Sequence, residues 1–135
     1  MNTAKELLKN GYTLALCSGD TVYTSKERGV KSLLRFVDEK INVKGFSCAD
    51  RVVGKGAAYL YVLLEVKEVH ACVISRCAKK VLDEYGIKVT YDTLVDRIIN
   101  RDKTGFCPVE EAVLNIGEPT VALDAIKNKL LSLSS

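Results

Sequence analysis

The chain has 135 residues, of which 47% are hydrophobic and 27% charged, an ordinary balance for one globular domain. Its 20 basic and 17 acidic residues give a net charge of +3, and the basic residues are scattered, with one adjacent pair at Lys79-Lys80. Such weak, dispersed charge argues against a dedicated nucleic-acid surface. No apolar run suits a signal peptide or approaches the ~20 residues that span a bilayer. We therefore expect a single cytoplasmic domain over residues 1–135 that contacts no membrane.

The first third of the chain predicts a short helix, a hairpin and a second helix. Residues 4–9 form the first helix, and an Asn-Gly pair ends it. The apolar runs 12–17 and 21–24 flank the turn sequence Ser18-Gly19-Asp20, which is typical of a β-hairpin. Residues 29–39 carry apolar side chains at the i, i+3, i+4, i+7 positions of an amphipathic helix.

The remainder of the chain predicts strands alternating with helices. The expected segments are a strand at 45–49, a buried helix at 53–64, a strand at 68–74, a helix ending at Tyr85, a strand at 87–90, an apolar segment at 94–99, and helices at 108–114 and 120–131. Ser75 stands where it would cap the helix that follows residues 68–74.

This order implies an α/β fold. Short β-α-β connections are right-handed crossovers between parallel strands, and the hairpin adds antiparallel strands. We expect a mixed sheet with helices on both faces, a three-layer α/β/α sandwich. Ligands in such folds bind beyond the carboxyl ends of parallel strands, so the junctions at 48–55 and 74–78 are the places to look for a site.

The two junctions resemble those of the cytidine deaminases. In that family one helix begins Cys/His-Ala-Glu and the next begins Pro-Cys-x-x-Cys, and these residues hold a zinc ion that activates water. Here Cys48-Ala49-Asp50 matches the first motif with Asp for Glu, whereas Ser75 and Ala78 occupy the remaining ligand positions and Cys77 is one residue out of step. A zinc site needs at least three protein ligands. The resemblance implies a deaminase-like fold without its metal.

A longer match covers about residues 10–115. The run from Ala49 to Ala58 is similar to the Ala-Asp-Lys-Val-Val-Gly-Lys-Ala-Ala-Ala signature of an uncharacterised bacterial family. The run from Ile99 to Glu110 is similar to its second signature, Ile-Asn-Arg-Asp-x-Thr-Gly-x-Cys-Pro-x-Glu. That family is a domain of unknown function with a deaminase-like fold and no metal motif. The resemblance implies the fold and the place of a pocket, with no cofactor.

The signature residues suggest a binding site for an anion. Gly54 and Lys55 lie near a predicted helix start, where free N–H groups and the helix dipole favour phosphate or carboxylate. The polar loop that begins at Asn100 precedes a helix with Pro108 at its start, as in a ligand-lining loop. We expect a small phosphorylated or nucleotide-like ligand to contact seven residues: Asp50, Gly54, Lys55, Ser75, Asn100, Arg101 and Thr104. A structural alternative is that Asp50 caps the helix and pairs with Lys55.

Other functions stay open at this point. Asp50 and Cys107 are candidate catalytic residues, the second because a thiol near a helix start can have a lowered pKa. A zinc-dependent nucleoside deaminase would use Cys48, Cys77 and Asp50. A non-catalytic regulatory or interaction protein is the third candidate, with a homodimer formed through the helix face of Tyr59 and Tyr61.

Overall fold

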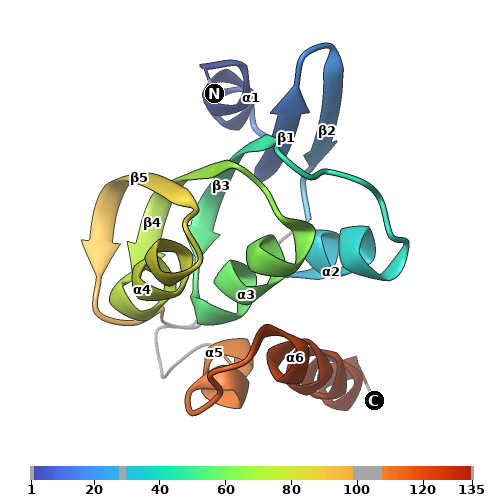
Figure 1. The fold of residues 1–135 in the computed structure, drawn as a ribbon, viewed down its shortest axis with the longest axis vertical. Helices are drawn as coiled ribbons and strands as arrows, with labels where there is room; N and C mark the ends of the chain where they lie inside the picture. Colours follow the sequence, from blue (N-terminus) through green and yellow to red (C-terminus); the bar gives the residue numbers. More distant parts are fainter. Residues whose placement is uncertain (1, 28–29, 99–107, 135) are drawn as a thin grey trace.

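The computed structural model describes residues 2–27, 30–98 and 108–134, which form five strands and six helices (Figure 1). In chain order the elements are α1 (Asn2–Lys9), β1 (Leu14–Ser18), β2 (Thr21–Ser25), α2 (Lys31–Asp38), β3 (Ser47–Val53), α3 (Lys55–Leu64), β4 (Glu68–Ser75), α4 (Arg76–Glu84), β5 (Lys88–Val95), α5 (Pro108–Val113) and α6 (Pro119–Ser134). Within the described residues, no helix is both long and apolar enough to cross a membrane.

The five strands form one mixed sheet in the order β2-β1-β3-β4-β5. β1 pairs antiparallel with both β2 and β3, and Gly19, at φ +56°, makes the turn of the predicted hairpin. β3, β4 and β5 are parallel, with α3 and α4 as the crossovers. The α/β class and the mixed sheet are therefore confirmed.

Helices lie on both faces of the sheet, but they cover the faces unequally. α1 packs on β1 and β3, where Ala4 and Leu8 form a small cluster with Ala15 and Ala49. The larger core on the other face contains Leu16, and α2, α3 and α4 contribute to it. α5 and α6 pack mainly against α3 and each other, so they lie beyond the helical layer, below α3 in Figure 1.

The main difference from the expected elements is the length of β3. The strand was expected to end at residue 49 and the helix to begin at 53, but β3 runs through Asp50 to Val53 and α3 begins at Lys55. Cys48 and Asp50 are therefore strand residues rather than the head of a helix. β5 is likewise longer than the expected strand and extends through Leu94 to Val95.

Candidate functional site

The start of α3 is held by a carboxylate from a distant part of the chain. Gly54 is the N-cap residue and, having no side chain, leaves the first helical N–H groups without a local acceptor. Glu110 of α5 supplies both acceptors: the N–H of Lys55 donates to its Oε1 at 2.7 Å, and the N–H of Gly56 donates to Oε2 at 3.0 Å. At this helix start, where the sequence predicted a ligand anion, the N–H groups of Lys55 and Gly56 are bonded to the protein's own carboxylate.

Gly54 allows this close approach. A Cβ atom added at Gly54 would collide with the carboxyl group of Glu110. The backbone at Gly54 is extended, at φ −98°, so any residue could adopt its conformation. Glycine is needed here because a side chain would not fit beside Glu110, and not because of its backbone conformation.

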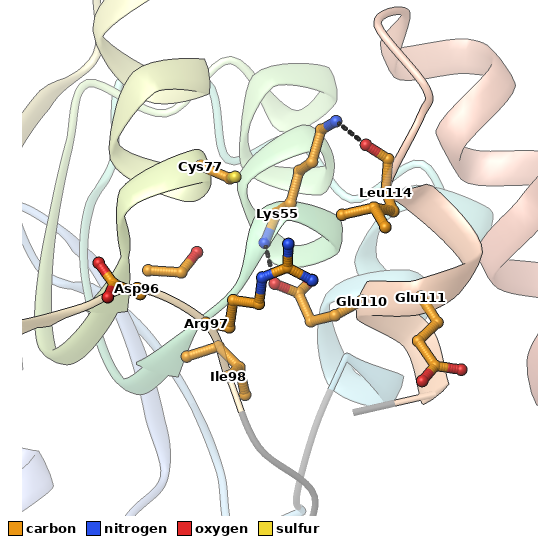
Figure 2. A pocket seen from close by; sticks show the side chains of 9 residues that line it. Lys55, Cys77, Asp96, Arg97, Ile98, Glu110, Glu111 and Leu114 are labelled. Carbon is orange, nitrogen blue, oxygen red and sulfur yellow. Dashed lines mark hydrogen bonds between the residues drawn. The ribbon is translucent and has the colours of Figure 1, made fainter. Parts of the chain in front are cut away.

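A pocket opens beside this helix start, at the carboxyl ends of β4 and β5 (Figure 2). Its volume is about 40 Å³, room for a few water molecules or a group of phosphate size. Figure 2 shows Arg97 and Glu110 reaching into it from different elements and the Cys77 thiol turned towards it, while Glu111 points away. The lining residues are Lys55, Ser75, Cys77, Asp96, Arg97, Ile98, Glu110, Glu111 and Leu114.

Hydrogen bonds hold most of the polar lining side chains in place. The Lys55 ammonium donates to the carbonyl oxygen of Leu114 at 2.9 Å. Ser75 caps α4 as predicted, with its hydroxyl oxygen accepting from the N–H of Ala78 at 3.1 Å. Arg76 donates to Asp96 at 2.7 Å, which fixes the chain just after β5. Hydrogen bonds therefore tie the start of α3 to α5, and the start of α4 to the residue that follows β5.

The structure brings part of the predicted site together. Lys55 and Ser75 line one pocket, and Gly54 lies directly behind Glu110. Asn100, Arg101, Thr104 and Cys107 lie outside the described residues.

Four charged lining residues were not predicted: Asp96, Arg97, Glu110 and Glu111. Glu110 had a usable signal, because it is the last residue of the second family signature and the first signature ends in α3. Asp96 and Arg97 follow β5, which the sequence pattern ended too early, and Glu111 is the neighbour of Glu110 in α5.

Asp50 does not belong to this pocket and does not cap α3, which corrects two interpretations of the sequence. It pairs with Leu14 and Ala71 in the middle of the sheet, and Ala71 is about 13 Å from the end of β4. The hydroxyl of Tyr61 donates to its Oδ2 at 2.8 Å. Burial raises the pKa of the Asp50 carboxyl to about 7, although hydrogen bonds from Tyr61 and from backbone N–H groups oppose the shift.

The zinc alternative fails on the placement of its ligands. Cys48 is fully buried beside Val69, whereas Cys77 follows the end of β4, six residues further along that strand. This places the two thiols about 20 Å apart along the sheet, far beyond the span of one ion with Zn–S bonds near 2.3 Å. Among residues 2–27, 30–98 and 108–134, no group of three His, Cys, Asp or Glu side chains could hold a metal.

The helix face expected to form a dimer is also unsuitable. Tyr59 and Tyr61 are 3% and 0% exposed, because other parts of the same chain cover them. The Tyr59 hydroxyl donates to the carbonyl oxygen of Ile116 at 2.8 Å, so this face of α3 contacts the segment between α5 and α6. A second copy of the chain could not reach it.

Comparison with known proteins finds one family model and a solved structure of the same family that are similar to this chain. The family model described as TM1506, a domain of unknown function (DUF1893), matches residues 2–130. The solved structure of a DUF1893 family protein (TM1506) from Thermotoga maritima is similar over 95% of this chain and 87% of its own, with 29% identity and a TM-score of 0.87. No curated protein matches the sequence.

Proposed function

This chain belongs to the TM1506 family, a domain of unknown function (DUF1893), and we propose that it binds a small phosphorylated, nucleotide-like ligand in the pocket beside the start of α3. The observation that carries the proposal is that the two family signatures meet there. Glu110 from the second signature accepts hydrogen bonds from the N–H groups of Lys55 and Gly56 in the first.

The position of the pocket supports the proposal. In α/β sheets, ligands bind beyond the carboxyl ends of the parallel strands. β4 and β5 end at Ser75 and Val95, next to lining residues of the pocket. The side chains that line it are therefore carried on loops and helix ends held by a rigid sheet, as is typical of binding sites.

The chemistry of the lining suits a ligand with one anionic end and several polar groups. An ammonium group has three N–H donors, and Lys55 gives one to Leu114, so two remain for a phosphate. Arg97 adds a guanidinium, which matches the geometry of phosphate oxygens. The carboxylate of Asp96 is an acceptor for hydroxyl and amino groups. The volume admits the phosphate group, and the rest of the ligand would lie across the open mouth.

The residues assigned to this ligand differ from those predicted. We keep Lys55 and Ser75, and we remove Asp50, which lies within the sheet, and Gly54, which the Glu110 carboxyl group covers. The roles of Asn100, Arg101 and Thr104 as ligand contacts, and of Cys107 as a catalytic thiol, stay predictions. The relation to the cytidine deaminases is part of the same proposal, and the β3-α3-β4-α4-β5 succession supports it. In this proposal the pocket works without a metal cofactor.

Calorimetry with three probes tests the proposal: inorganic phosphate, cytidine and cytidine monophosphate. We expect the nucleotide to bind most tightly, because only it has both the anionic group and the hydroxyl and amino groups. Lys55→Met should weaken nucleotide binding at least tenfold, the effect of about 1.4 kcal/mol.

The matched control is Lys127→Met. Lys127 lies on α6 and pairs with Asp38 at 2.7 Å, away from the pocket, so its loss should leave binding unchanged. Thermal melts of both variants would verify folding. The proposal is refuted if none of the three probes binds, or if Lys55→Met binds the nucleotide as tightly as the unaltered protein.

A further inference from the structure

We propose that β5 is the interface with a second copy of this chain, so that two five-stranded sheets join edge to edge around a two-fold axis. β5 is an edge strand of eight residues whose described neighbours are β4 on one side and α4 above it. In Figure 1 it forms the left margin of the sheet, and no labelled element lies beyond it. A long, uncovered edge strand presents unpaired backbone N–H and C=O groups.

The backbone of β5 shows which residues face outward. The N–H of Lys88 donates to the carbonyl oxygen of Lys67, just before β4, so the polar backbone groups of Lys88 point towards β4. In a parallel ladder the neighbouring residues alternate. Val89 and Tyr91 therefore direct their N–H and C=O groups to the free edge.

This alternation restricts how a second β5 can pair with the first. An antiparallel pair exchanges two hydrogen bonds between facing outward residues. Placing Val89 opposite the second copy's Tyr91, and Tyr91 opposite its Val89, satisfies four N–H groups and centres the two-fold axis on Thr90. A β-branched residue facing an aromatic one is a favourable cross-strand pair.

The charges on β5 fit the same arrangement. With the axis at Thr90, Lys88 of each copy lies opposite Asp92 of the other, giving two opposite-charge pairs. Both side chains are exposed, and three residues separate them along β5. Moving the pairing by two residues towards the carboxyl end would place Lys88 opposite Leu94, and moving it by four would place Asp92 opposite itself. The charge pattern therefore selects one alignment.

The surrounding surface agrees with this choice. α4 has Arg76, Lys79 and Lys80 in its first half and Asp83 and Glu84 in its second. These residues and Leu94 of β5 line a shallow groove. Two copies related by the axis would run their α4 helices antiparallel on one face, with basic halves against acidic halves. The opposite edge strand, β2, has five residues and no charged side chain, so it offers no such complementarity.

Sedimentation velocity over a range of protein concentrations tests the interface. We expect a reversible dimer. Asp92→Lys would place two Lys–Lys pairs across the axis and should weaken the dimer by about 10-fold to 100-fold, since each cross-strand pair changes from attraction to repulsion. The double variant Lys88→Asp with Asp92→Lys restores opposite charges and should restore the dimer.

The double variant is the decisive control. Asp92 also lies 3.6 Å from the Nε2 of His70, so the single change alters a contact within the chain, but so does the double variant. Recovery of the dimer in the double variant therefore isolates the charge pairing between copies. A chain that stays monomeric at every concentration overturns the proposal. So does a dimer that the single change leaves intact, or one that the double variant fails to recover. These outcomes are independent of ligand binding in the pocket.

Discussion

Replacing Glu110 by Ala is the most direct test of the described site. The change removes two hydrogen bonds from N–H groups to a half-buried carboxylate, at 2.7 and 3.0 Å. Hydrogen bonds to charged groups contribute ~1.5–3 kcal/mol each, and loss of a helix N-cap costs ~1 kcal/mol, but the two effects overlap. We therefore expect Glu110→Ala to lower the free energy of unfolding by about 2–4 kcal/mol. Glu110→Gln keeps one acceptor oxygen and should cost about half as much.

Urea unfolding followed by circular dichroism measures these differences. The matched control is Glu111→Ala, because Glu111 is the next residue of the same short helix, is exposed and points away from α3. Its loss should change the free energy of unfolding by no more than ~0.5 kcal/mol. If Glu110→Ala and Glu111→Ala unfold at the same urea concentration with the same slope, then Glu110 does not stabilise the start of α3 and the site is wrongly described.

Two further predictions concern Gly54 and Asp50. Gly54→Ala should destabilise the protein by about 1–3 kcal/mol, because the added Cβ displaces the Glu110 carboxyl group, and the penalty should largely vanish in a Glu110→Ala background, as a double-mutant cycle would show. Additive effects of the two changes would contradict this coupling. The pKa of Asp50, about 7 when folded, lies above its ordinary 3.8, so the folded state binds the proton more tightly. The stability that this proton contributes is complete below about pH 4 and is lost as the pH rises to about 7. Asp50→Asn has no such loss. When the pH is raised from 4 to 8, the free energy of unfolding of the unaltered protein should therefore fall by about 1–4 kcal/mol relative to that of the variant. A gap that is constant over this range would refute the buried-carboxyl interpretation.

The sequence predicted the fold well where local patterns decide the structure. The hairpin around Gly19 follows from turn chemistry, and the helix after Ser75 follows from its capping residue, and both are present. The longest match, between residues 10 and 115, correctly pointed to a family whose model matches residues 2–130.

The errors arise where tertiary contacts override local patterns. Asp50 and Arg51 resemble the polar start of a helix, but they extend β3, because Tyr61 satisfies the carboxyl group and the strand pairs on both sides. No local signal shows this, since the hydroxyl comes from the following helix. The start of α3 was likewise assigned to nearby residues, whereas its acceptor is 55 residues away. Spacing along the chain could not reveal that partner.

The distance between α3 and Glu110 also orders events during synthesis of the chain. At 5–20 residues per second, α3 precedes its capping carboxylate by about 3–11 s. During that interval the N–H groups of Lys55 and Gly56 lack this acceptor. The contact closes a long loop, and such contacts form late because their loop-closure entropy is high. Glu110→Ala should therefore accelerate unfolding and leave the refolding rate nearly unchanged. We therefore expect α5 to pack late in folding, onto a β-α-β core that has already formed.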